Sequence, residues 1–122
     1  MDITKIVSEI NKVGGKRIKF ILHFGSSAHK KNTPLSDIDI GVYYDGTADE
    51  RFKFRMKALG ALPDKVDLHI FQDVPLTVQR EMLQGKVVYG NNEQVLYDEA
   101  IRVAREFSRF EKYYNMCLRA VV

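Results

Sequence analysis

Two aspartates stand two positions apart in a short, alternating stretch of the chain. Residues 37–43 read D-I-D-I-G-V-Y, and this period of two is typical of a β-strand. It places Asp37 and Asp39 on one face, roughly 7 Å apart along the backbone. Mg²⁺ prefers oxygen ligands and usually takes one or two protein carboxylates, leaving other positions to water and substrate phosphates. The pair predicts a site for a divalent cation and a phosphate-bearing substrate.

A third carboxylate lies in a second alternating stretch, V-D-L-H-I-F at residues 66–71. Asp67 would share a face with His69, opposite the aliphatic residues of the strand. On a strand next to the first, Asp67 could complete a two-metal arrangement, as a metal ligand or as the general base. A strand histidine is more often packed or hydrogen-bonded than functional, so His69 is not assigned to the predicted site.

A small turn, Gly25-Ser26-Ser27, follows the apolar run at residues 20–24. Glycine lets the backbone approach a phosphate without a Cβ clash, and the Ser26 hydroxyl can donate a hydrogen bond to a phosphate oxygen. If a helical turn follows, its free N–H groups would also favour an anion. Alone, a glycine-serine pair is usually an ordinary turn. Beside the carboxylates, we expect Gly25, Ser26 and Ser27 to contact phosphate groups of the substrate.

Alternating helices and strands must position these groups. Apolar spacing and breakers predict helices at residues 3–13, 49–62, 76–83 and 93–118, and strands at 17–24, 37–43, 66–71 and 86–89, with a short helical turn or loop at 28–36. This order predicts an α+β domain with α/β-type layers, a mixed β-sheet flanked by helices and a long C-terminal helix. We expect one domain over residues 1–122, with its core at about 17–90.

Two of the predicted helices raise the question of which side chains face the core. In the helix at 49–62, the residues near helical spacing are Phe52, Met56, Leu59 and Leu62. In the last helix, the apolar positions are Val95, Ala100, Ile101, Ala104, Phe107 and Tyr114. Its aromatic residues fit either a core-facing stripe or a partner surface, and the spacing does not choose between them: Tyr97, Phe107, Phe110, Tyr113 and Tyr114.

Composition narrows the function classes. The formal net charge is +3 and the basic residues are scattered, so a dedicated duplex-DNA binder is not expected, although an anionic small molecule would be favoured. Cys117 is the single cysteine, which fits a reducing cytoplasm. The N-terminal residues lack the apolar core of a secretory signal, and the run at 20–24 is too short to cross a bilayer. We expect a cytoplasmic protein without direct nucleic-acid or membrane binding.

The spacing of these motifs carries a family resemblance. Gly25-Ser26, ten residues, then Asp37-Ile38-Asp39 resembles the G-S-x10-D-x-D signature of the DNA polymerase beta-like nucleotidyltransferase superfamily. The small size, and the likeness over residues 20–90, resemble the minimal nucleotidyltransferases of prokaryotes, and Asp67 falls where their third carboxylate is expected. The chain departs from that group at Ser27 and Lys30, where Arg and Gly are frequent.

The resemblance implies a metal-dependent enzyme that transfers AMP from ATP, with Mg²⁺ or alternatively Mn²⁺. Many such proteins are similar to antitoxins that pair with a small helical HEPN-type toxin, and some transfer AMP to a tyrosine of that toxin. Two other functions stay open: a non-catalytic antitoxin of the same fold that silences its partner by contact, and transfer to a small-molecule acceptor, which would need a further substrate-binding domain. Homo- and hetero-oligomers are both compatible with the sequence.

Overall fold

The structure is a computed structural model that describes residues 2–25 and 37–121. The elements follow the order α1 (Ile3–Gly14), β1 (Ile18–Phe24), β2 (Ile38–Tyr44), α2 (Ala48–Gly60), β3 (Val66–Ile70), α3 (Leu76–Leu83), β4 (Lys86–Gly90) and α4 (Glu93–Val121), with short 3-10 turns at Gly15–Arg17 and Phe71–Asp73. Each predicted helix and strand forms close to its expected bounds. The helical turn or loop expected at residues 28–36 lies outside the described residues.

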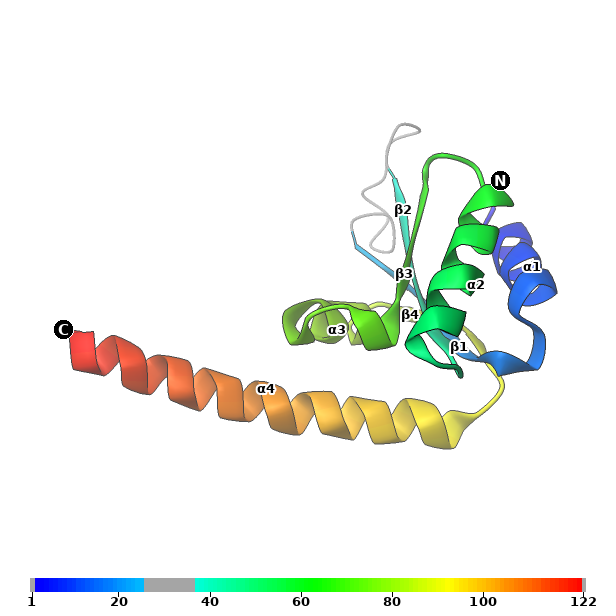
Figure 1. Cartoon of the computed structure of the whole chain (residues 1–122). Coiled ribbons are helices and arrows are strands. Elements are labelled where there is room, and N and C mark those ends of the chain that lie inside the picture. Colours follow the sequence, from blue (N-terminus) through cyan, green and yellow to red (C-terminus); the bar gives the residue numbers. More distant parts are fainter. Residues whose placement is uncertain (1, 26–36, 122) are drawn as a thin grey trace.

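The four strands form one sheet in the order β3-β2-β1-β4. β1 pairs antiparallel with both β2 and β4, whereas β2 and β3 run parallel. Helices α1 and α2 cover one face of the sheet, and α3 with the first part of α4 covers the other (Figure 1). The predicted α+β architecture with a mixed sheet and a long C-terminal helix is confirmed.

The alternation of β2 explains how one strand serves both a core and a site. Ile40 and Val42 are buried against α1 and α2. Asp39 and Gly41 point to the opposite face, because successive side chains alternate across a strand. On that face, an aromatic and aliphatic cluster joins the sheet to α3 and α4; its buried members are Phe20, Leu22, Phe24, Phe71, Met82 and Val103.

Helix α2 does not bury all of the apolar residues that stand near helical spacing in its sequence. Phe52 and Met56 are 60% and 42% exposed, and the helix buries Phe54 and Ala58 instead. The Phe54 ring stacks on Tyr44 at a centroid distance of 4.4 Å. Apolar residues lie on several sides of this helix, so its spacing alone did not decide which side the sheet would cover. Leu59 and Leu62, from the same spaced set, do pack on the core.

Helix α4 is held by the domain only along its first part. Val103 is buried, and Val95 and Leu96 pack beside it. Ile101, one of the apolar positions of this helix, is half exposed, because α3 and β1 cover a different side of the helix. Beyond Phe107, α4 projects away from the domain (Figure 1). Within the described ranges, none of the helices combines the length and apolar character needed to span a membrane.

Candidate active site

Strands β2 and β3 place two of the predicted carboxylates side by side. In their parallel register, Asp39 pairs with Asp67 and Gly41 pairs with His69. Neighbouring residues in register point to the same face of a sheet. Both carboxylates therefore lie on the face that α3 and α4 cover, at the end where β2 begins.

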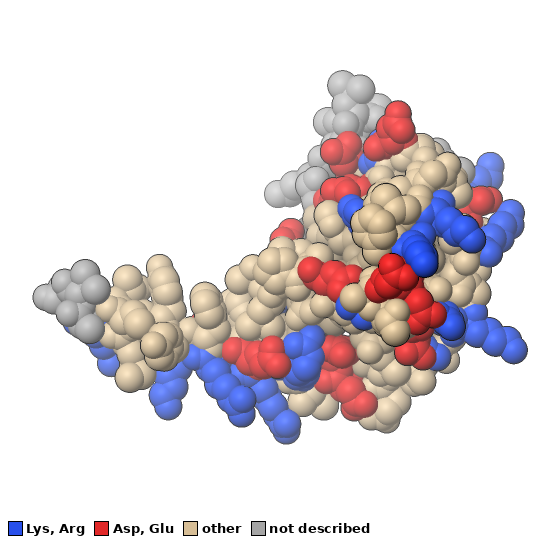
Figure 2. All heavy atoms as spheres, viewed as in Figure 1, with Lys and Arg blue, Asp and Glu red and all other residues tan. Residues whose placement is uncertain are grey.

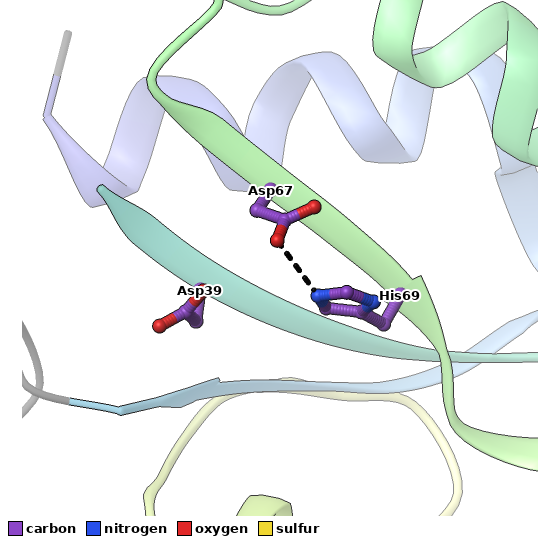
Figure 3. A group of neighbouring side chains, drawn as sticks. All are labelled: Asp39, Asp67 and His69. Atoms are coloured by element: carbon purple, nitrogen blue, oxygen red, sulfur yellow. Dashed lines mark ion pairs between the residues drawn. The ribbon is translucent and has the colours of Figure 1, made fainter. Parts of the chain in front are cut away.

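Three side chains converge at this point. One ligand atom from each of Asp39, Asp67 and His69 lies within 4.8 Å of the other two, and Figure 3 shows the three on the neighbouring strands. His69 Nε2 is 3.0 Å from Asp67 Oδ2, and the Asp67 side chain is half exposed. Two carboxylates fit a hard divalent cation such as Mg²⁺ or Mn²⁺, while the imidazole adds a nitrogen ligand that Mg²⁺ does not require.

The charge at this site favours a cation. Partial burial raises the pKa of the Asp39 carboxyl above its ordinary value, and the neighbouring Asp67 carboxylate raises it further. His69 acts in the opposite direction, and the charges of Asp37 and Glu81 add smaller increases to the Asp39 pKa. Carboxylates that repel one another in a partly desolvated place are stabilised when a positive ion binds between them.

Gly25 brings the backbone directly against the Asp39 carboxylate. Its φ is +79°, a conformation that L side chains rarely adopt. A Cβ at this position would lie 2.3 Å from Asp39 Oδ2, which is far inside van der Waals contact. The predicted phosphate turn therefore begins beside the predicted metal carboxylate. Ser26 and Ser27, the other predicted phosphate contacts, lie outside the described residues, as does Lys30.

Asp37 occupies the position just before β2 and is exposed. It does not belong to the group of three side chains that lie within 4.8 Å of one another. It is nevertheless close enough for its charge to affect the pKa of Asp39. The structure thus brings together Asp39, Asp67 and Gly25 from the predicted set, with Asp37 at the margin. His69 joins them, and the sequence signal for it was the alternation that places it on the Asp67 face.

Helix α3 is packed tightly onto the sheet beside this site. Gly41 has no side chain on the Asp39 face, and a Cβ there would lie 2.7 Å from Met82 Sδ. At the end of α3, a Cβ on Gly85 would lie 2.3 Å from the His23 carbonyl oxygen. Both close approaches hold α3 against β1 and β2. They explain why Glu81, on α3, contributes to the electrostatics of Asp39.

Comparison with known proteins agrees with this geometry. The family model described as polymerase beta, nucleotidyltransferase matches residues 4–94, which is 91 of the 122 residues. The matched region contains β1, β2 and β3 with every residue of the site. The chain belongs to this nucleotidyltransferase family.

Individual proteins resemble this chain in sequence or in fold. A proposed protein adenylyltransferase of Methanocaldococcus jannaschii is 29% identical over 95 residues, spanning 78% of this chain and 68% of the relative. A chain of a toxin-antitoxin crystal structure with AMP-PNP superposes with a TM-score of 0.77 at 20% identity, covering 98% of both chains. A chain from the structure of a tri-AMPylated Shewanella oneidensis HEPN toxin with its MNT antitoxin gives 0.70 at 21% identity, covering 97% and 93%.

Proposed function

We propose that this protein is an adenylyltransferase that transfers AMP from ATP to a hydroxyl group of a protein, and that this acceptor is a tyrosine of a HEPN-type toxin. In that role the chain is an antitoxin. The observation that carries the proposal is the register of β2 and β3, which sets Asp39 beside Asp67 while the Gly25 backbone lies against the Asp39 carboxylate. Family membership supports the same reaction class.

In this reaction, Asp37 and Asp39 would hold Mg²⁺, or Mn²⁺ in its place. The ion, when bound, neutralises phosphate charge and lowers the pKa of the attacking hydroxyl. The acceptor oxygen forms a bond to the α-phosphorus of ATP, the bond from that phosphorus to the bridging oxygen breaks, and pyrophosphate leaves. Asp67 either accepts the hydroxyl proton or completes the metal site. Both roles suit a half-exposed carboxylate next to Asp39.

Two further parts of the site position these groups. The turn that begins at Gly25 holds the nucleotide phosphates, with Gly25 supplying the close backbone approach and Ser26 and Ser27 supplying polar contacts. His69 lies against Asp67 at 3.0 Å, so its imidazole restrains the direction of that carboxylate. These contributions are positional, and they suit a transfer that depends on alignment and on charge neutralisation.

The choice of a protein acceptor rests on relatives. One curated relative is named as a proposed protein adenylyltransferase, and one structural neighbour is a complex that contains a tri-AMPylated HEPN toxin. The chain itself has no second domain that could hold a small-molecule acceptor among its described residues, since its helices and strands form one sheet and its covering layers.

The test is label transfer to a HEPN-type toxin that co-purifies with this protein. We expect label from ATP carrying ³²P in the α-phosphate, and none from ATP carrying it in the γ-phosphate. Asp39→Asn should lower the rate on the order of 10³-fold, equivalent to about 4 kcal/mol of transition-state stabilisation. Asp64→Asn, at an exposed position outside the site, is the matched control and should leave the rate unchanged. Equal loss in both variants, or γ-label on the toxin, would refute adenylyl transfer.

A further inference from the structure

Helix α2 places an arginine against the outer edge of the sheet, beside the candidate site. β3 is an edge strand, because the strand order is β3-β2-β1-β4, and α2 packs next to it (Figure 1). Arg55 Nε donates a hydrogen bond of 2.9 Å to the Leu68 carbonyl oxygen of this strand. Leu68 stands between Asp67 and His69, so the guanidinium is fixed beside the segment that supplies both of these site residues.

Among the described residues, the partly buried Arg55 guanidinium forms no ion pair. Other arginines near α2 do: Arg17 pairs with Glu50, and Arg51 binds Asp73 through Nε at 3.1 Å and Nη2 at 2.8 Å. Figure 2 shows acidic and basic side chains interspersed over the surface that α2 forms, so this surface as a whole has no single sign of charge. A partly desolvated guanidinium without a carboxylate favours an external anion, which would form strong charge-assisted hydrogen bonds with it.

A hollow of about 420 Å³ opens at this edge of the sheet; its lining includes Phe52, Arg55, His69, Asp73 and Val74. Asp73 is already neutralised by Arg51, so the positive charge of Arg55 is the one in this hollow that lacks a described partner. The Phe52 ring, 60% exposed, adds an apolar wall. The hollow therefore suits a short segment of a partner that carries a carboxylate beside an apolar group.

The order of the strands places this hollow on the acceptor side of the candidate site. Gly25 follows β1, Asp39 lies on the neighbouring β2, and Asp67 lies on the edge strand β3. Two strand spacings, about 10 Å, separate β1 from β3. If the nucleotide phosphates bind at Gly25, a hydroxyl that gives its proton to Asp67 approaches from the β3 side. His69 connects the two places, because its Nε2 lies 3.0 Å from Asp67 Oδ2 (Figure 3) and the residue also lines the hollow.

We propose that this hollow is an acceptor subsite, in which Arg55 binds a carboxylate of the acceptor protein close to the hydroxyl that is modified. This inference rests on the proposed function, because it takes a protein as the acceptor. The Leu68 carbonyl holds Nε, which leaves the two terminal nitrogens of the guanidinium to bind the two carboxylate oxygens. The contact selects the acceptor and holds its hydroxyl beside Asp67. Arg55 is therefore a residue that determines specificity, and it takes no part in bond making.

The binding test compares two cations of α2 that stand two positions apart. Arg55 lines the hollow, whereas Lys57 is exposed and lies outside it. Binding of a HEPN-type toxin that co-purifies with this protein is measured by calorimetry without ATP. Arg55→Gln should weaken Kd about 10-fold, as expected for the loss of a hydrogen bond between charged groups, whereas Lys57→Gln should change it less than about 2-fold. An unchanged Kd for Arg55→Gln would overturn the proposal.

Loss of the Leu68 contact is a second effect of Arg55→Gln, and steady-state kinetics of label transfer separate it from loss of the anion site. An acceptor subsite predicts a KM for the toxin that rises about 10-fold, while the KM for ATP and kcat change less than about 3-fold. A displaced β3 would instead move Asp67 and lower kcat. A fall in kcat without a change in the KM for the toxin would therefore overturn the proposal. A raised KM for ATP alone would also overturn it, because it would place Arg55 on the nucleotide side.

A double-mutant cycle identifies the carboxylate that Arg55 binds. Acidic residues of the toxin are replaced one at a time by the corresponding amides, and binding is again measured without ATP. One of these replacements should weaken binding to the unsubstituted protein about 10-fold but change binding to Arg55→Gln less than about 2-fold, because side chains in contact do not act independently. Independent effects for every acidic residue of the toxin would overturn the proposal.

The binding experiment also separates failure of the subsite from failure of the proposed function. Because binding is measured without ATP, the Arg55→Gln result does not depend on chemistry. If no label reaches the toxin while Arg55→Gln weakens binding and one toxin carboxylate couples to Arg55, the proposed reaction is wrong and the hollow still binds that carboxylate. If label transfer is lost in Asp39→Asn but Arg55→Gln keeps a normal Kd, the reaction stands and the subsite is wrong.

Discussion

The Gly25 backbone lies so close to the Asp39 carboxylate that a single added carbon would collide with it. A Cβ on Gly25 would be 2.3 Å from Asp39 Oδ2, and the two residues come from the paired ends of β1 and β2, where Phe24 is the register partner of Asp39. The turn and the carboxylate therefore act as one unit. Any side chain at position 25 must displace either the backbone or the carboxylate.

Gly25→Ala should impair catalysis much more than folding. The positive φ costs an alanine about 1–2 kcal/mol of folding free energy. The added Cβ also displaces the Asp39 carboxylate, so the rate of AMP transfer should fall about 100-fold, as expected when a catalytic group is misplaced by about 1 Å. Gly60→Ala is the matched control, because a Cβ there meets nothing within 4 Å. Steady-state rates and thermal melts of both variants check this. A Gly25→Ala enzyme with normal turnover would show that the close approach is not needed.

Asp39→Asn should stabilise the metal-free protein at pH 7. Burial and the Asp67 charge raise the Asp39 pKa in the folded state, so ionising Asp39 above its unfolded pKa costs stability, and a neutral amide removes that cost. The gain in Tm should stay below the ~4 °C that 1 kcal/mol gives in a domain of this size. It should vanish near pH 3, where Asp39 is protonated in both states. Calorimetric melts of both proteins at pH 7 and pH 3 measure these Tm values. A lower Tm for Asp39→Asn than for the unsubstituted protein at pH 7 would contradict the prediction.

Divalent metal should stabilise the unsubstituted protein and not the Asp39→Asn variant. An ion that binds only the folded state raises stability by mass action, and it requires the ionised carboxylate. Tm in 10 mM Mg²⁺ or Mn²⁺ should therefore exceed the value in chelator for the natural sequence alone. Because the Asp39 pKa is raised, this metal effect should fade on acidification at a higher pH than an ordinary aspartate would give. An equal shift in both proteins would place the metal elsewhere.

The hydrogen bonds at the N-terminus of α2 should contribute measurably to the free energy of unfolding of this protein. Thr47 Oγ1 accepts a hydrogen bond from the Glu50 amide at 3.2 Å, and Glu50 Oε1 accepts one from the Thr47 amide at 2.9 Å. Removing the first bond in Thr47→Ala should cost about 1 kcal/mol in urea unfolding. Ser8→Ala, at an exposed position within α1, should change stability by less than about 0.5 kcal/mol. Equal effects would show that the cap contributes nothing.

Much of the fold could be predicted because it depends on local patterns. Alternation defined β2 and β3, and the breakers at Gly14 and Pro63 set helix ends close to where they occur. The inward face of α2 could not be predicted, because Phe52 and Phe54 are equally apolar and only tertiary contacts, such as the stacking of Tyr44 on Phe54, select Phe54. For the same reason, spacing could not show where α4 leaves the domain.

The candidate site was predictable by residue type but not by geometry. The two strands were each expected, yet only the parallel register sets Asp67 directly beside Asp39. His69 joins them because it shares the Asp67 face and lies 3.0 Å from that carboxylate, a distance that alternation alone does not give. The contact between Gly25 and Asp39 depends on tertiary pairing of β1 with β2, so no local signal could reveal it.

The most direct test of the central claim is intact-mass spectrometry of the HEPN-type toxin after incubation with this protein, ATP and Mg²⁺, beside the same reaction with Asp39→Asn. Adenylyl transfer predicts a mass gain of one or more AMP groups on the toxin, localised to a tyrosine and seen only with the unsubstituted protein. A toxin that is bound and silenced without any gain in mass would contradict catalysis and identify the protein as a non-catalytic antitoxin.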